Sequence, residues 1–307
     1  MSLRVAYLCM ESVFSVRPLE ALLAAGHDVR FVMRPIGPLA SRNEAVLKRH
    51  RGFDLAMRRL LGLKDDTIHT NPLAVAADRD IPAWLCGNAN TPQVQQLLRR
   101  EKVDLIVVAF FNQLLKPAVL AIPELGAVNF HPSLLPAYRG PSPLFWTYKD
   151  GCETTGLTIH RIAAGEDDGA VLRRLPAPLP LGKAGEDLVD ELADLAAAHI
   201  VAAVEDVAKG MPGDAQDPIA ATRAPRPAEQ DLIIDGAVPA RRLFHFARGV
   251  GRWNPLWCSA VGDRLRVLDA DSWDDSAALP GEHALVGDIL HLGTVDGIVR
   301  LKVRPLA

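Results

Sequence analysis

The chain has 307 residues, of which 49% are hydrophobic and 23% are charged, with a formal net charge of −3 and a pI of about 6.3. These values are ordinary for a soluble globular protein and do not require nucleic acid or an anionic membrane as a partner. The sequence contains no run of 18 or more apolar residues, so we expect no transmembrane helix. The apolar run at residues 5–10 is too short for a secretory signal and is closed by Glu11, which predicts a cytoplasmic protein.

Four cysteines, Cys9, Cys86, Cys152 and Cys258, are scattered along the chain without a CxxC spacing. A zinc site built on cysteine pairs is therefore not expected, and a chain of this size does not need a disulfide framework. We predict four reduced and mostly buried thiols, and no bound metal.

The first 33 residues alternate between strand and helix patterns. Residues 3–10 form a short apolar run typical of a buried strand, and residues 18–25 are predicted as a helix that ends at Gly26, a residue suited to the left-handed position after a helix. Residues 28–33 alternate like a second strand. This order predicts a βαβ unit, and thus a parallel sheet, although the GxGxxG motif of dinucleotide-binding proteins is absent after the first strand.

A basic segment follows at residues 42–64. It carries seven Lys and Arg against two Asp and Glu, a net charge of +5, and its apolar residues are interleaved at a spacing that favours a helix. Two interpretations stay open for this segment: a solvated helix face, or a patch that binds phosphate or RNA.

The alternation of strand and helix patterns continues to residue 207. Strands are predicted at residues 80–84, 104–110, 126–131 and 158–162, and helices at residues 92–100, 116–122 and 184–207. We therefore expect an α/β fold with an open, mostly parallel, Rossmann-like sheet that carries helices on both faces.

The composition changes after residue 208. Residues 209–230 are rich in Gly and Pro and poor in large apolar residues, as in a linker between domains. A helix is then predicted at residues 239–248, and short β-like runs at residues 264–268, 288–292 and 298–303 predict a small β-rich domain. The expected organisation is a large domain at residues 1–208, a linker at residues 209–230 and a small domain at residues 231–307.

The densest group of chemically capable side chains is the run Asn129-Phe130-His131-Pro132-Ser133-Leu134-Leu135-Pro136-Ala137-Tyr138-Arg139-Gly140. Asn129 and His131 are two residues apart, so in an extended strand their side chains point to the same side. The prolines and the glycine that follow end the regular structure, which fits a ligand site near the carboxyl end of a strand. An Asn and a His in this place could also serve only hydrogen bonds within a loop.

A second group, Gly165-Glu166-Asp167-Asp168-Gly169, follows about 30 residues later. An acidic run that ends in glycine predicts a turn that holds a carboxylate at a defined position. Together with this carboxylate, the Asn and the His can perform acyl transfer. Asn129 and His131 can stabilise the oxyanion that develops on the acyl oxygen, while Asp167 can accept a proton from an attacking amine or raise the basicity of His131.

The runs NFHPSLLPAYRG and GLTIHRIAAGEDDGAVL resemble the signature of the folate-dependent formyltransferases. This family includes methionyl-tRNA formyltransferase, the sugar-nucleotide formyltransferases, glycinamide ribonucleotide formyltransferase and the hydrolase domain of formyltetrahydrofolate dehydrogenase. Asn129, His131, Arg139 and Asp167 match motif positions of the family, whereas Asp168 is a neighbour of the family aspartate. The resemblance covers most of the chain, since residues 216–255 are similar to the linker and the start of the C-terminal domain of the tRNA enzyme.

The resemblance implies transfer of a formyl group from 10-formyltetrahydrofolate to an amine, with Asn129, His131 and Asp167 as catalytic residues. It further implies a catalytic domain at residues 1–208 and a C-terminal β-barrel of oligonucleotide-binding type at residues 231–307. The folate-binding residues implied by the resemblance are Ala109, Phe110, Phe111, Leu114, Leu115, Ala163, Gly165, Glu166 and Asp168. The residues of the implied substrate-side loop are Ser133, Tyr138 and Arg139.

The sequence departs from the family's tRNA enzymes in three places. Met10-Glu11-Ser12 stands where those enzymes usually have a Gly-Thr-Pro turn, a different segment opens at residue 34 in place of their basic loop, and residues 226–307 carry ten Lys and Arg against eleven Asp and Glu. A domain that clamps tRNA would be expected to carry net positive charge. We therefore expect a small-molecule amine, such as an amino sugar or a hydroxylamine, as the acceptor. The alternatives are initiator tRNA as the acceptor, a formyltetrahydrofolate hydrolase, and a non-catalytic folate-binding protein.

Overall fold

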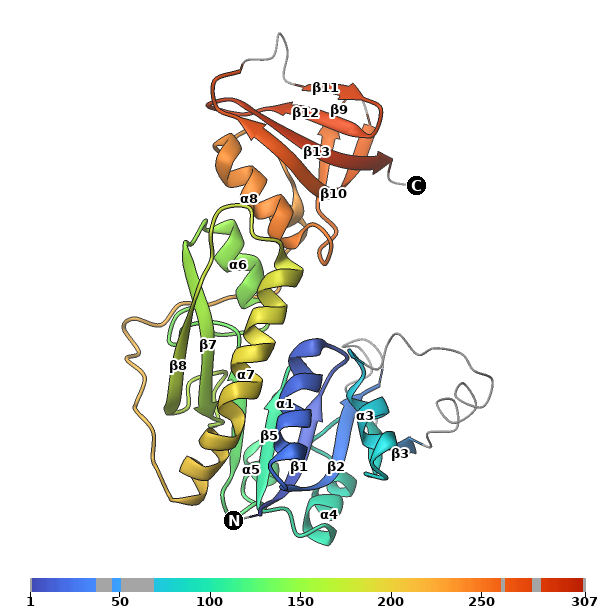
Figure 1. The fold of residues 1–307 in the computed structure, drawn as a ribbon, viewed down its shortest axis with the longest axis vertical. Helices are drawn as coiled ribbons and strands as arrows, with labels where there is room; N and C mark the ends of the chain where they lie inside the picture. The colour runs from blue at the N-terminus through green and yellow to red at the C-terminus, as the bar shows by residue number, and fades with distance from the viewer. Residues whose placement is uncertain (1, 37–45, 51–68, 261–262, 278–282, 306–307) are drawn as a thin grey trace. The chain divides into compact units, whose positions relative to one another are not determined.

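The computed structural model describes residues 2–36, 46–50, 69–260, 263–277 and 283–305 (Figure 1). The chain forms two compact units, each assembled from three segments. The first unit consists of Met1–Arg139, Gly156–Pro176 and Val189–Thr222, and the second consists of Gly140–Thr155, Ala177–Leu188 and Arg223–Ala307. No helix among the described residues is long and apolar enough to cross a membrane.

The first unit is built on an eight-stranded sheet with the strand order β3-β4-β2-β1-β5-β6-β7-β8. Its strands are β1 (Arg4–Cys9), β2 (Asp28–Pro35), β3 (Leu47–His50), β4 (Ala83–Cys86), β5 (Leu105–Ala109), β6 (Ala127–His131), β7 (Thr154–Arg161) and β8 (Val171–Pro178). The five neighbours from β4 to β6 run parallel, while β3 and β7 pair antiparallel with β4 and β6. The predicted open and mostly parallel α/β sheet is therefore confirmed.

Helices cover both faces of this sheet. They are α1 (Val13–Ala24), α3 (Pro72–Asp78), α4 (Pro92–Arg100), α5 (Pro117–Leu120) and α7 (Gly185–Ala208). Alternate residues of a strand point to opposite faces. On one side of β1, the Tyr7 hydroxyl donates to the carbonyl of Ser15 in α1 at 2.7 Å. On the other side, Ala6 and Leu8 share a buried cluster with Leu97 of α4.

Three predicted elements differ in the structure. The strand predicted at residues 80–84 is β4, which begins only at Ala83 and runs to Cys86. Helix α1 begins at Val13, five residues before the predicted start, because the Ser12 hydroxyl caps it by accepting from the Phe14 amide at 3.1 Å. Residues 47–50 of the basic segment form strand β3 and not the expected helix, because their backbone pairs with the edge strand β4. The remainder of that segment, residues 42–45 and 51–64, lies outside the described residues apart from Val46.

The second unit contains a curled five-stranded antiparallel sheet with the order β11-β12-β13-β10-β9, which forms a half-barrel (Figure 1). Its strands are β9 (Trp257–Ala260), β10 (Asp263–Asp274), β11 (His283–Val286), β12 (Ile289–Gly293) and β13 (Ile298–Pro305). Helices α6 (Pro143–Lys149) and α8 (Ala240–Val250) pack against each other through the rings of Phe145 and Phe246, whose centroids are 5.3 Å apart. Gly249 permits this contact, because a Cβ at that position would lie 2.1 Å from the Tyr148 ring.

All four cysteines are free thiols. Cys9, Cys86 and Cys258 are buried and Cys152 is half-buried, which agrees with the predicted set of reduced, mostly buried thiols. Burial raises the pKa of the Cys258 thiol to about 11 and raises the pKa of Cys9 further still. The buried thiols therefore stay protonated and serve as packing groups.

Candidate functional site

Strands β6 and β7 place four polar side chains on one face of the sheet. Asn129 and His131 are two residues apart in β6, and the antiparallel register sets His160 opposite Asn129 and Thr158 opposite His131. Residues directly opposite each other on neighbouring strands share a face, so all four side chains lie together. His131 is 3% exposed and His160 is 1% exposed. The pair of strands thus forms a buried polar floor.

The loop between β7 and β8 brings Asp167 over this floor. The loop is closed by the Arg161 amide, which donates to the Ala170 carbonyl at 2.8 Å. It requires glycine at position 169, where a Cβ would lie 1.9 Å from the Arg161 carbonyl oxygen. Asn129 Nδ2 donates to Asp167 Oδ1 at 3.3 Å, and His131 Nδ1 lies 3.5 Å from Asp167 Oδ2. The three residues predicted to be catalytic therefore converge in the structure, and their catalytic role stays a prediction.

The hydrogen bonds of His131 determine which ring nitrogen faces the site. Its Nε2 lies 2.8 Å from the carbonyl oxygen of Tyr138, and because a carbonyl only accepts, Nε2 carries a proton. Nδ1 is then the nitrogen that faces Asp167, and a proton on either partner makes that contact attractive. Burial lowers the pKa of the His131 imidazole, and His160 lowers it further, while the nearby Asp167 carboxylate acts in the opposite direction.

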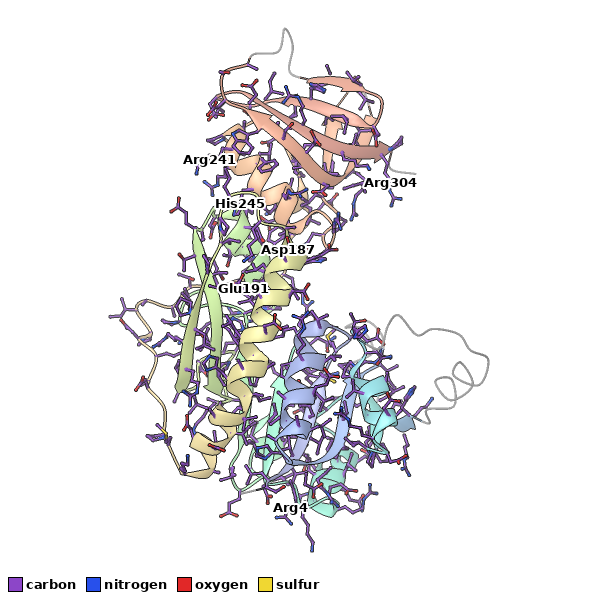
Figure 2. All side chains as sticks on the ribbon, viewed as in Figure 1. Arg4, Asp187, Glu191, Arg241, His245 and Arg304 are labelled. Carbon is purple, nitrogen blue, oxygen red and sulfur yellow. The ribbon has the colours of Figure 1, made fainter. Side chains whose placement is uncertain are left out.

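Three buried histidines predict how stability depends on pH. Burial lowers the pKa of His27, His131 and His245 below the ordinary value of 6.5 (His245 is labelled in Figure 2). A lowered folded-state pKa means that the unfolded chain takes up protons that the folded chain does not. We expect the free energy of unfolding to be constant near pH 8 and to fall as the pH drops below 6.5 toward the folded pKa values. Urea unfolding at several pH values between 8 and 5 measures this change. A stability that rises over the same interval would contradict the prediction.

His160 belongs to the site although it was not among the residues predicted from the sequence. Its Nδ1 donates to the Arg161 carbonyl at 2.8 Å, so its unprotonated Nε2 accepts from Asn129 Nδ2 at 3.2 Å. Both hydrogens of the Asn129 amide group are therefore directed, one to His160 and the other to Asp167. The period-two spacing of Thr158 and His160 was a visible signal, but its meaning depends on the register between β6 and β7.

The predicted substrate-side loop is held by a hydrogen bond of its own and by hydrogen bonds to Thr158 and Gln216. The Ser133 hydroxyl is buried and donates to the Ala137 carbonyl at 2.7 Å, and the Thr158 hydroxyl donates to the Ser133 carbonyl at 2.6 Å. The Arg139 guanidinium donates through Nη2 to Gln216 Oε1 at 2.7 Å. Tyr138 adopts a left-handed backbone conformation, with φ of 60°, and so turns its carbonyl toward His131.

The predicted folate-binding residues lie on two segments beside the floor. Ala109 ends strand β5, whose Val108 is the register partner of Asn129. Phe110 is 47% exposed and Leu114 is 60% exposed, whereas Phe111 and Leu115 pack into the hydrophobic core. The second segment contains Ala163, Gly165, Glu166 and Asp168, of which all but the half-buried Glu166 are exposed. The part of the chain that the structure describes contains no group of three or more His, Cys, Asp and Glu side chains that could hold a metal ion.

Comparison with known proteins adds a second line of support. The family model described as Formyl transferase matches residues 60–204. The chain is 34% identical to methionyl-tRNA formyltransferase of Pseudomonas fluorescens over 68% of its own length and 65% of that protein. It is 31% identical to methionyl-tRNA formyltransferase of Chloroflexus aggregans over 91% of its own length and 84% of that protein.

The chain belongs to the folate-dependent formyltransferase family. A solved structure with the same fold is the N-formyltransferase of Helicobacter canadensis, which was solved in complex with folinic acid and dTDP-3-aminofucose. It matches with a TM-score of 0.69 and 14% identity, over 98% of both chains. Asn129, His131 and Asp167, which converge in the structure, are the residues predicted from the sequence to be catalytic, and that role stays a prediction.

Proposed function

We propose that this protein transfers a formyl group from 10-formyltetrahydrofolate to an amine. The observation that carries the proposal is the convergence of Asn129, His131 and Asp167 on the β6 face, in a chain of the formyltransferase family. A carboxylate next to two groups that can donate hydrogen bonds suits acyl transfer, in which a proton must leave the nucleophile while charge develops on an oxygen.

The segment after β5 suits a flat donor with an apolar ring system. Phe110 and Leu114 expose apolar surface there, directly beyond the strand that neighbours Asn129. A binding site for such a ligand combines apolar walls with a few polar groups, and the backbone of residues 163–168 can supply the latter. When bound, the folate supplies the activated formyl carbon and a leaving nitrogen.

Asn129, His131 and Asp167 each have a separate part in the proposed reaction. Asn129 Nδ2 can donate to the formyl oxygen, as negative charge builds on it, once one of its two hydrogens turns away from His160 or Asp167, and His131 Nδ1 can donate there when the ring carries a proton on both nitrogens. Asp167 can accept the proton that the acceptor amine loses as its nitrogen bonds to the formyl carbon. That proton is returned to the folate nitrogen as its bond to the formyl carbon breaks, so that the site regains its starting protonation state.

A small-molecule amine is the acceptor that we propose. The C-terminal 82 residues carry no excess of positive charge, and part of their basic surface is already engaged. Arg264 pairs with Glu229 at 3.3 Å and stacks on the Trp257 ring at 3.7 Å, and Lys302 lies 4.0 Å from Asp288. Nucleic-acid affinity depends on clustered cations that release counterions, so a near-neutral surface favours a small acceptor. The end-to-end match with an N-formyltransferase solved with an amino-sugar nucleotide supports the same choice.

Initiator tRNA is the second candidate. The curated relatives named above are methionyl-tRNA formyltransferases, and residues 42–64 carry a net charge of +5 that could contact RNA. Of the seven cations in this segment, Lys48 and Arg49 fall within the described strand β3.

A panel of acceptors separates these candidates. We expect the protein to form a new N-formyl product with 10-formyltetrahydrofolate and one class of small amine, such as an amino-sugar nucleotide or a hydroxylamine, and to formylate charged initiator tRNA poorly at physiological salt. Mass spectrometry of the products provides the measurement. If the protein instead formylates the tRNA efficiently, and loses this activity when Lys48 and Arg49 are changed to Ala, then initiator tRNA is the acceptor. Formate release at an equal rate without any amine would indicate a hydrolase.

A further inference from the structure

Residues 214–222, termed here the bridging segment, contact both loops of the candidate site although their composition is that of a linker. At one end, the Asp214 amide donates to the Val171 carbonyl at 2.8 Å, just after the loop that carries Asp167. At the other end, Thr222 accepts from the Tyr138 amide through its hydroxyl at 2.8 Å and from the Arg139 amide through its carbonyl at 2.9 Å. The bridging segment therefore lies between the loop that follows β6 and the loop that follows β7.

Gln216 lies within the bridging segment and uses both ends of its amide. Its Nε2 donates to the carbonyl oxygens of Asp167 at 2.8 Å and of Gly169 at 2.7 Å. Its Oε1 accepts from Arg139 Nε at 3.0 Å and from Nη2 at 2.7 Å. Both N–H groups of Nε2 therefore donate to the turn at residues 167–169, and Oε1 accepts from the Arg139 guanidinium of the other loop.

We propose that Gln216 is a positioning residue that fixes the Asp167 carboxylate against Asn129 and His131. The inference rests on the proposed formyl transfer, because the position of Asp167 determines turnover only if the protein catalyses that reaction. Arg139 contributes from the far side, since a charged donor on Oε1 polarises the amide and strengthens the hydrogen bonds that Nε2 donates.

The conformation of Asp167 explains why the turn needs such support. Its φ of 53° lies in the left-handed region, which is unfavourable for a residue with a Cβ and persists only where the surroundings hold it. The carboxylate leaves the same turn to reach Asn129 Nδ2 at 3.3 Å and His131 Nδ1 at 3.5 Å. A loop that relaxes toward ordinary backbone angles would swing the carboxylate away from both groups.

The imidazole of His131 provides a direct readout of this position. The charged and titratable groups that act on it are Asp167 and Glu166 from the loop and His160 from β7. In Gln216→Met, which keeps the side-chain length but removes both donors, we expect the His131 pKa to fall further, because the carboxylate that favours the protonated ring has moved away. NMR titration of histidine labelled with 13C at Cε1 measures this pKa, with His131→Asn identifying the signal.

Ile219→Ser is the matched control, because Ile219 lies in the same segment, is 93% exposed and should leave the titration unchanged. Circular dichroism and thermal unfolding report whether each variant folds. Gln216→Asn keeps the amide but is one methylene too short to reach both loops, so it gives the same test with less disruption if the methionine variant does not fold. An unchanged His131 titration in a folded Gln216 variant would overturn the proposal.

Kinetics test the link to turnover with the amine of the acceptor panel that reacts fastest. We expect Gln216→Met to lower kcat by roughly 10-fold to 100-fold with little change in the KM for 10-formyltetrahydrofolate, by the usual effect of a misplaced catalytic group. In the Asp167→Asn background the same substitution should have almost no further effect, because Gln216 acts through that carboxylate. Fully multiplicative losses would contradict the proposal. If the wild-type protein formylates no amine, the proposed function fails, while the titration of His131 still tests Gln216.

Discussion

Asp167→Asn is expected to lower kcat by roughly 100-fold or more, the usual scale for a positioned acid–base group. The substitution keeps the size of the side chain but removes the charge that lies 3.5 Å from His131 Nδ1, and with it the ability to accept a proton. Binding of folinic acid should change much less, because the proposed apolar walls are untouched. Steady-state kinetics and isothermal calorimetry measure the two effects separately.

Asp168→Asn is the matched control for that substitution. It makes the same chemical change one residue later, where the Asp168 carboxylate lies beside Gly165, so closely that a Cβ on that glycine would be 2.1 Å from Asp168 Oδ2. We expect a milder loss of turnover. Near-normal turnover of Asp167→Asn would show that the proton leaves through another group or through solvent.

Asn129→Leu is expected to lower kcat by roughly 100-fold to 1000-fold, the effect of removing one donor to a developing oxyanion. Leucine has nearly the same size, so the floor stays filled, but the hydrogen bonds to Asp167 and His160 are lost together with the proposed contact to the formyl oxygen. Single-turnover kinetics at saturating folate isolate the chemical step.

A second variant shows whether lost stability alone explains such a result. Asn71→Ala removes an asparagine cap from α3, where Oδ1 accepts from the Leu73 amide at 3.0 Å. This change should cost about 1 kcal/mol of stability and leave turnover as it is. If Asn129→Leu retained activity comparable to Asn71→Ala, the proposed oxyanion contact would be wrong.

The fold class could be predicted because buried parallel strands leave a clear pattern. Residues 3–10 and 104–110 are nearly continuous apolar runs, as strands covered on both faces must be. Elements that depend on partners were not predicted. Strand β3 contains Lys48, Arg49 and His50 and exists through pairing with β4, and β8 presents Arg173 and Arg174, so neither shows an apolar period.

The residues of the candidate site also fall into some that could be predicted from the sequence and some that could not. The shared side of Asn129 and His131 follows from the two-residue period of a strand, and the structure places both on one face. His160 could not be placed, because its position opposite Asn129 is a matter of register between two strands. Gln216 stood in a stretch of Gly and Pro, where composition predicts only a connection. Its four contacts are all to residues at least 47 positions away in the chain.

The division of each unit into three segments has a consequence for synthesis. Helix α6 of the second unit leaves the ribosome about a hundred residues before α8, the helix on which Phe145 packs. The first unit is likewise incomplete until residue 222 has been made, although Asn129 and His131 were added long before. Synthesis of the second unit therefore begins before all residues of the first unit have been made. The first unit closes only after residue 222 has been made, and the second only after the strands that follow Trp257 have been made, so the apolar faces of the early segments stay exposed until then.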